Sequence, residues 1–307
     1  MRNTIKMLFL LSLLGFLFSC GKNDILTPDE KPGIQFGTIN TLDIVTWNLK
    51  LFPEETDLVS LKQMIPAIGA DVIAFQEIMD YTAFMQMAED IPYYDAFVYD
   101  ATSDYRLAYL YDTRTITIID QYTIYNNDSN PFPRPPYVLE IEWQGTPYYI
   151  INNHLKAYGD NFIDETDDYD EEVRRRLACQ KLDLYITANL PDSRVVVLGD
   201  LNDQIAEPRE YNVFLSFIDK PQHYLFADMD IALAPSYNTV SYPSSLSHID
   251  HILITNELFA DFIGTGSYCK TILAESWMLN WANYSSSISD HRPVGIRLAP
   301  PASFPGS

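Results

Sequence analysis

The sequence contains few cysteines and few basic residues, and each shortage argues against a class of protein. Three of the 307 residues are cysteines, with no CxxC pair and no Cys/His cluster, so a disulfide scaffold and a structural zinc site are disfavoured. Lysine and arginine total 20 against 42 acids, and the formal net charge is −22. This charge opposes a broad basic nucleic-acid groove, although a bound metal ion can supply local positive charge to a phosphate-handling enzyme. Whether Cys179 and Cys269 pair is left open.

Long hydrophobic runs are also scarce, and the one at the N-terminus is too short to span a bilayer comfortably. Residues 7–18 are apolar and follow two basic residues, which is typical of a secretory signal. The run ends in "LFSC", which resembles a bacterial lipobox. We therefore expect residues 1–19 to be a lipoprotein signal peptide and Cys20 to be lipidated. Residues 20–41 would tether an exported protein to the cell envelope, with the outer membrane as the expected location; an ordinary signal peptide with an incidental cysteine is the alternative.

The remaining chain alternates short apolar runs with a few helical patterns, and no repeat of 20 to 50 residues is present. Strands outnumber helices, and each half runs strand, helix, hairpins, which predicts an α+β fold of two packed β-sheets with helices outside. We expect one domain over residues 42–299 and a tail over 300–307. The helix over 171–190 is expected to bury Val173, Leu177, Leu184 and Ala188.

Polar clusters recur where the predicted apolar strands end or begin. Rigid strand ends hold side chains while leaving them accessible, so such clusters favour a shared site at one sheet edge. Carboxylate and amide oxygens suit a hard cation such as Mg²⁺, and histidines beside carboxylates suit proton transfer near neutral pH. The clusters contain Asn48, Gln76-Glu77, Asn153-His154, Asp200 with Asn202, Asp250, and Asp290-His291.

These clusters resemble the motifs of the endonuclease/exonuclease/phosphatase superfamily, the deoxyribonuclease I-like hydrolases. The quoted stretches are "TWNL", "FQEI", "NNHLKA", "GDLND", "HIDHIL" and "SDHRPV", in the family's order over about residues 42–299. The resemblance implies a four-layer α/β-β/α sandwich of two mostly antiparallel sheets flanked by helices.

The resemblance also implies a role for each matching residue. Asn48, Glu77 and Asp290 would be metal ligands, and the ion would be Mg²⁺ or Mn²⁺. Asp200 would orient or deprotonate the attacking water, with Asn202 beside it contacting phosphate. His154 and His291 would flank the scissile phosphorus, and Asp250 would pair with His291.

Three further residues are expected to contact substrate on weaker grounds. Arg134 resembles an arginine that contacts phosphate in some nuclease relatives, and Lys156 lies two residues after His154, so it can share that face. Either can equally be a solvated surface residue. Tyr105 falls where relatives carry a tyrosine or a glutamate. Secreted deoxyribonucleases have a carboxylate there behind the first histidine, and its lack here favours relatives that rely on metal and tyrosine.

Other polar and aromatic features are given structural interpretations. His223, His248 and His251 are expected to be core or surface residues. The acidic run over 160–172 lacks the spacing and the glycine of a calcium loop, so we expect a solvated loop preceding a helix. Trp277, Trp281 and Tyr284 are expected to be core aromatics, with a stacking wall for a base or sugar as the alternative.

The most favoured function is a metal-dependent phosphodiesterase, an endonuclease that cleaves nucleic acid by in-line attack of a metal- and Asp-activated water. The alternative is a phosphatase or phosphodiesterase on small or lipid substrates such as inositol phosphate, sphingomyelin or sugar phosphate, which need no extended basic track. A non-catalytic envelope lipoprotein is least favoured because no expected catalytic position is replaced. We expect a monomer.

Overall fold

The computed structural model describes residues 33–99 and 105–299. Cys20, the expected signal peptide and most of the expected tether lie outside these residues, as does the 300–307 tail. Among the described residues, no helix has the length and apolar character needed to cross a membrane.

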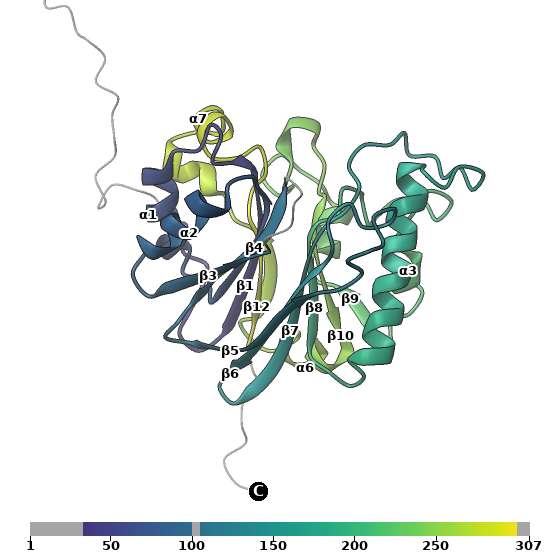
Figure 1. Ribbon diagram of the computed structural model, residues 1–307, viewed down its shortest axis with the longest axis horizontal. Coiled ribbons are helices and arrows are strands. Elements are labelled where there is room, and N and C mark those ends of the chain that lie inside the picture. Colours follow the sequence, from purple (N-terminus) through teal and green to yellow (C-terminus); the bar gives the residue numbers. More distant parts are fainter. Residues whose placement is uncertain (1–32, 100–104, 300–307) are drawn as a thin grey trace, which may run out of the picture. The chain divides into compact units, whose positions relative to one another are not determined.

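Two six-stranded sheets pack face to face, with helices on their outer surfaces (Figure 1). The first sheet has the strand order β11-β12-β1-β2-β4-β3 and the second the order β5-β6-β7-β8-β10-β9. Figure 1 shows α1, α2 and α7 outside the first sheet and α3 outside the second. The strands are β1 (Leu42–Phe52), β2 (Val72–Ile78), β3 (Tyr94–Val98), β4 (Arg106–Asp112), β5 (Ile116–Thr123), β6 (Tyr137–Trp143), β7 (Thr146–His154), β8 (Val195–Asp200), β9 (Tyr224–Phe226), β10 (Asp250–Thr255), β11 (Tyr268–Thr271) and β12 (Val294–Leu298). The α-helices are α1 (Leu58–Ile68), α2 (Tyr81–Glu89), α3 (Glu171–Asn189), α4 (Leu215–Ile218), α5 (Met229–Leu233), α6 (Phe259–Phe262) and α7 (Trp281–Ser287).

Both sheets are mixed, and this arrangement confirms the predicted sandwich. The parallel pairs are β1 with β2 and β7 with β8, each joined by a helical crossover, α1 or α3. The other pairings are antiparallel. Because parallel neighbours run in the same direction, β1 and β2 end at one edge of their sheet, and β7 and β8 end together in the other.

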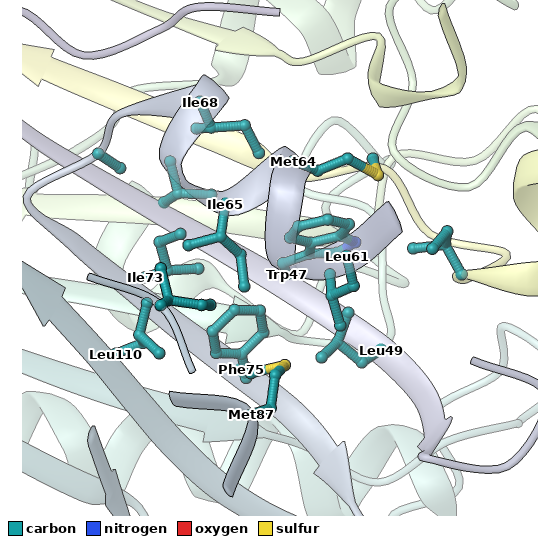
Figure 2. Close-up of a cluster of buried hydrophobic side chains, with 14 of the residues drawn as sticks. Trp47, Leu49, Leu61, Met64, Ile65, Ile68, Ile73, Phe75, Met87 and Leu110 are labelled. Carbon is teal, nitrogen blue, oxygen red and sulfur yellow. The ribbon is translucent and has the colours of Figure 1, made fainter. Parts of the chain in front are cut away.

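Alternate residues of each strand face different layers, as the pleat requires. In β1, Ile44 packs between the sheets, whereas Val45 and Trp47 face the helices. Figure 2 shows α1 placing Leu61 and Ile65 over this outer surface. Burial on both faces explains why the central strands are continuous apolar runs.

Helix α3 differs from the prediction in the face it buries. The expected inner residue Leu184 is 64% exposed, and Ala188 is exposed too, so that prediction is wrong. The buried face carries Leu182 and Ile186 together with Arg175, whose Nε lies 2.7 Å from Asp203 Oδ2. Because ion pairs occupy part of the buried stripe, counting apolar residues selects the wrong side of this helix. Val173 and Leu177, the other two expected inner residues, are only half-buried.

The packed domain also begins earlier than the expected boundary at residue 42. Ile34 and Phe36, which were assigned to the tether, are buried, and Phe36 N donates to Ile68 O at 2.8 Å. Two apolar side chains on a polar segment are enough to anchor it to the first sheet. Cys179 and Cys269, whose pairing the sequence left open, are both free thiols.

Candidate active site

The strand ends bring the predicted polar side chains to one edge of the sandwich. Asn48 and Glu77 come from the parallel neighbours β1 and β2, while His154 and Asp200 are paired residues at the ends of β7 and β8. Asp250 begins β10 directly opposite Asp200 in the antiparallel ladder. The topology therefore gathers residues that are far apart in the sequence, as the motifs predict.

Local backbone geometry at this edge explains two residue choices. Gly199 has φ 138°, and a Cβ there would lie 1.9 Å from Asn153 O, so only glycine lets β8 approach β7. Glu77 has φ 62° and Asn202 has φ 56°, a region that non-glycine residues rarely occupy. Strain of this kind often occurs at functional sites, where surrounding contacts hold it in place.

Asp200 lies at the centre of the cluster. Its Oδ2 accepts from Asn48 Nδ2 at 2.9 Å and lies 3.6 Å from His154 Nε2 and 3.8 Å from His291 Nε2. Its Oδ1 accepts from Asn202 N at 3.1 Å. Burial raises the pKa of Asp200 to about 7, against the opposing effects of His291 and the Asn48 hydrogen bond. A carboxylate with such a pKa can hold or release a proton near neutral pH.

The ligand set around Asp200 fits a divalent cation. Ligand atoms of Glu77, His154 and Asp200 lie within 4.8 Å of one another, and so do those of Asp200, Asp250 and His291. The Asp250 and Glu77 carboxylates add to the raised pKa of Asp200, so these anions repel one another unless a cation lies between them. Asn48 joins Glu77 to Asp200, because its Nδ2 also donates to Glu77 Oε1 at 3.1 Å.

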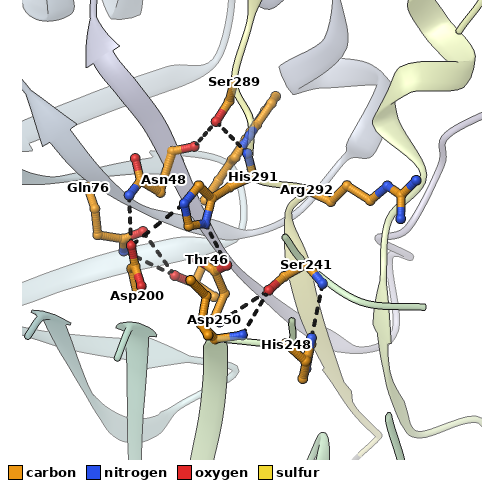
Figure 3. A network of polar contacts seen from close by, with 12 residues as sticks. Thr46, Asn48, Gln76, Asp200, Ser241, His248, Asp250, Ser289, His291 and Arg292 are labelled. Atoms are coloured by element: carbon orange, nitrogen blue, oxygen red, sulfur yellow. Dashed lines mark hydrogen bonds and ion pairs between the residues drawn. The ribbon is translucent and has the colours of Figure 1, made fainter. Parts of the chain in front are cut away.

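His291 lies in a network of polar contacts that includes Asp200, Asp250 and Ser289 (Figure 3). Its Nδ1 lies 2.8 Å from Asp250 Oδ2. Burial lowers its pKa, but the Asp250 and Asp200 carboxylates outweigh that effect and raise it to about 10. The Ser289 hydroxyl ties the adjacent backbone in place, since it donates to Asn48 O at 2.6 Å and accepts from His291 N at 3.0 Å.

His154 contrasts with His291 in its charge. Burial, and then the positive charges of Arg134 and His291, lower the pKa of His154 well below its ordinary value, so this histidine is neutral. Its Nδ1 is buried and makes no hydrogen bond within the described part of the chain. This agrees with the lack of a carboxylate at position 105. Tyr105 is there instead, and the Arg134 guanidinium carbon lies 5.0 Å from the centroid of its ring.

Of the remaining predicted site residues, some lie near Asp200 and His154 and others do not. Arg134 is within the electrostatic field of Glu77 and Asp200, and Asn202 donates from Nδ2 to Leu155 O at 3.2 Å beside His154. Asp290 adjoins His291 but belongs to neither close ligand group found in the described residues. Lys156 lies apart, because its ammonium is 3.3 Å from Glu171 and above the Tyr158 ring. Contact of Lys156 with substrate stays a prediction.

The features interpreted as structural are structural in the fold. His248 and His251 are buried and share the Asp228 carboxylate, whereas His223 is exposed. Tyr284 is buried and donates to His291 O at 2.6 Å.

Two further parts of the chain agree with these interpretations. Trp277 and Trp281 pack against the helix-side core. The 160–170 loop consists of turns and bends, and its last acids begin α3.

Sequence reasoning missed two residues of the long segment between β9 and β10. Ser241 Oγ accepts from Asp250 N at 3.2 Å, and the Tyr242 ring lies against His291 with centroids 4.8 Å apart. The segment has no periodic pattern, and a Ser-Tyr pair in it carries no signal that distinguishes it from an ordinary loop.

A mixed two-sheet sandwich with clustered carboxylates and a carboxylate-backed histidine at one edge defines a metal-dependent phosphoesterase. The chain belongs to the Endonuclease/Exonuclease/phosphatase family, whose match covers residues 45–291. Members of this family are divalent-metal-dependent hydrolases, and the protein is accordingly a hydrolase acting on phosphate ester bonds. No curated protein matches the chain.

Solved structures share the fold at low sequence identity. Truncated Caenorhabditis elegans TDP2 is 15% identical with a TM-score of 0.60, covering 84% of this chain and 98% of that one. The human Nocturnin catalytic domain with bound sulfate is 15% identical with a TM-score of 0.58, covering 84% and 94%. A Bacteroides vulgatus endonuclease/exonuclease/phosphatase is 15% identical with a TM-score of 0.57, covering 84% and 98%.

Proposed function

We propose that the protein is a Mg²⁺-dependent phosphodiesterase that cleaves nucleic acid by in-line attack of water on a phosphodiester. The observation that carries this proposal is the position of Asp200, between a neutral and a charged histidine and beside Glu77. Asn48 and Glu77 would hold the ion, with Asp290 adjoining His291 beside them. A bound Mg²⁺ would polarise the phosphoryl oxygens and lower the pKa of water.

The chain's own residues supply the proton and charge chemistry. Asp200 accepts a proton from the attacking water as the new O–P bond forms, and its carboxylate is oriented for this by hydrogen bonds from Asn48 Nδ2 and Asn202 N. The charged His291 stabilises the negative charge that develops on the phosphoryl oxygens. The P–O bond to the leaving group breaks, the leaving oxygen takes a proton from solvent, and Asp200 returns its proton to solvent.

A specific observation also favours the second candidate, hydrolysis of a small or lipid phosphate ester. The net charge is −22, and a long polyanion would be repelled by most of such a surface. In the fold family, a TDP2 structure from D. rerio contains a single-strand DNA product. This supports a nucleic-acid substrate for that protein. If the present protein also cleaves nucleic acid, a strand end or a single strand suits its acidic surface better than a long duplex does.

A substrate panel tests the proposal. The purified domain is incubated with plasmid DNA, single-stranded DNA, RNA, sphingomyelin, inositol phosphates and sugar phosphates, each with Mg²⁺ and with EDTA. We expect cleavage of nucleic acid with Mg²⁺ and none with EDTA, and Asp200→Asn is the matched inactive control. Intact nucleic acid together with hydrolysis of a lipid or small ester would replace the first candidate by the second.

We infer further that the protein is exported, lipid-anchored at Cys20 and monomeric. The signal-like segment and its lipobox support export and the lipid anchor. Replacing Cys20→Ser should release the full chain from the membrane fraction of a bacterial host. Retention of the Cys20→Ser protein in that fraction would contradict the anchor.

A further inference from the structure

Tyr242 contacts the reaction centre although no motif marks it. Its ring packs against the His291 imidazole, with centroids 4.8 Å apart and planes at 46°. The side chain is half-buried, so part of it remains accessible. Tyr242 therefore contacts His291, a residue that the proposed reaction uses.

The backbone around Tyr242 is fixed to the same elements that carry the reacting groups. Tyr242 N donates to Ser247 O at 2.9 Å, and Ser247 N donates back to Tyr242 O at 3.1 Å. The preceding residue, Ser241, accepts from Asp250 N through its hydroxyl and from Arg292 N through its carbonyl, at 3.2 and 2.8 Å. The ring is thus pre-positioned relative to Asp250 and His291 and is not carried on a loosely attached loop.

The Tyr242 hydroxyl makes no hydrogen bond to any residue in the described part of the chain. Partial burial raises the pKa of this phenol, and the carboxylates of Asp290, Asp200 and Glu77 raise it further, so the group is a protonated donor near the reaction centre. The hydroxyl is not among the buried polar atoms that lack a partner, so it is open to solvent and an anionic substrate can reach it.

We propose that the Tyr242 hydroxyl donates a hydrogen bond to a non-bridging oxygen of the scissile phosphate, beside His291. The inference rests on the proposed function, which puts a phosphate ester at this site. In a cluster of carboxylates, a neutral donor adds an attraction for phosphate oxygens without another buried charge. Tyr242 would then be a catalytic residue, because it touches the reacting group.

Two substitutions separate the hydroxyl from the ring. Tyr242→Phe removes the donor and keeps the packing on His291, whereas Tyr242→Leu removes both. With bis(p-nitrophenyl) phosphate and Mg²⁺, we expect Tyr242→Phe to lower kcat/KM about 10- to 100-fold, as for a hydrogen bond to a charged group. Tyr169→Phe, a hydroxyl removal at a 74% exposed loop position, is the matched control and should leave kcat/KM unchanged.

A binding measurement keeps the test independent of turnover. Inorganic phosphate titrated calorimetrically into the Mg²⁺-loaded enzyme should bind at least several-fold more weakly to Tyr242→Phe than to wild type. Wild-type kcat/KM and phosphate affinity in Tyr242→Phe, with losses only in Tyr242→Leu, would overturn the proposal and leave the ring as a support for His291. Tyr242-dependent phosphate binding without hydrolysis of any ester would refute the proposed function and the catalytic role of Tyr242, and would leave Tyr242 as a phosphate-binding residue.

Discussion

Two histidine–carboxylate clusters lie close together in this molecule, and they differ in how closely the histidine nitrogens approach the central carboxylate, Asp228 in one and Asp200 in the other. In the buried cluster of Asp228, His248 and His251, His251 Nδ1 is 2.5 Å from Asp228 Oδ2 and its Nε2 is 2.8 Å from Asp203 O. Asp228 Oδ1 also accepts from Ile252 N at 3.0 Å.

His248 completes that buried cluster as a neutral histidine. Its Nδ1 accepts from Ser241 N at 3.1 Å, so the ring proton is on Nε2, which lies 3.0 Å from Asp228 Oδ2. These atoms could in principle form a metal site. Because Nδ1 already uses its lone pair, however, Nε2 carries a proton and has no lone pair for a metal. The cluster joins Asp228 to the two histidines that flank Asp250 in the chain.

The reaction-centre cluster is more loosely paired around its central carboxylate. His154 Nδ1 and Asp250 Oδ1 are buried and have no hydrogen-bond partner in the described residues, and in the buried cluster the same holds for His248 Nε2. The histidine nitrogens lie 3.6 and 3.8 Å from Asp200 Oδ2, too far for hydrogen bonds.

The two buried aspartates also have opposite pKa shifts. For Asp228, burial is outweighed by its two histidines, which lower its pKa. For Asp200, burial and the neighbouring carboxylates raise it. A carboxylate held closely by two histidines stabilises the fold, whereas Asp200, with no histidine within hydrogen-bond distance and a raised pKa, is suited to bind a ligand.

The largest difference between the clusters should be in activity. We expect Glu77→Ala and His291→Ala each to reduce kcat/KM at least about 1,000-fold, ~4 kcal/mol of barrier, because they remove metal binding or charge stabilisation. Turnover on the best substrate of the panel measures this, with circular dichroism to confirm folding. Turnover within about tenfold of wild type, ~1.4 kcal/mol, would show that the roles are assigned wrongly.

The buried cluster should act on stability. Asp228→Asn leaves His251 without its carboxylate, and we expect about 3 kcal/mol less free energy of unfolding in urea, with the folded fraction still active. The Asp228 pKa is lowered and the His251 pKa is raised from 6.5 in the fold. Wild-type His251 therefore contributes stability below pH 6.5, which would be lost only as pH rises through its folded pKa.

In Asp228→Asn, burial without the carboxylate leaves His251 neutral when folded, while the unfolded histidine binds a proton below pH 6.5. The deficit should therefore grow as pH falls from 8 to 5. A deficit that is constant over this range would argue against a charged pair.

Binding of a divalent metal should change the free energy of unfolding through the reaction-centre cluster only, and by less than the Asp228 substitution does. Mg²⁺ at about 100 times its Kd should raise the free energy of unfolding of EDTA-treated protein by ~2.7 kcal/mol, because the ion binds only the folded site. Glu77→Gln should lose this gain, and Asp228→Asn should retain it. The opposite pattern in thermal unfolding would place the ion in the buried cluster.

The exposed His223 sets the baseline for losing a histidine. Its side chain belongs to neither cluster. We expect His223→Ala to change the free energy of unfolding by less than about 0.5 kcal/mol and to leave kcat/KM unchanged. A larger effect in either assay would mean that losing any histidine lowers stability or activity. Effects of substitutions in the two clusters could then not be assigned to the clusters themselves.

Much of the fold could be predicted because its central strands are covered on both sides. Val195 to Leu198 forms a continuous apolar run, which is typical of a buried strand, and the polar residues after it are local and easy to recognise. The short strand β3 (Tyr94–Val98) has little sequence signal, because its five residues do not alternate regularly between apolar and polar. The inner face of α3 was mispredicted because the charged side chain of Arg175 is buried. Its ion pair with Asp203 allows this burial, and a count of apolar residues cannot detect it.

The sequence by itself determined which residues end each strand, and hence the chemical groups available at the sheet edge. Only the tertiary structure decided which partners each histidine has, since His251 and His291 both adjoin an aspartate in the chain and His248 lies two residues from one. Their roles follow from partners such as Asp228 and Ser241, which are remote in sequence. Hydrogen-bond geometry and burial arise from chain crossings, and no local pattern encodes them.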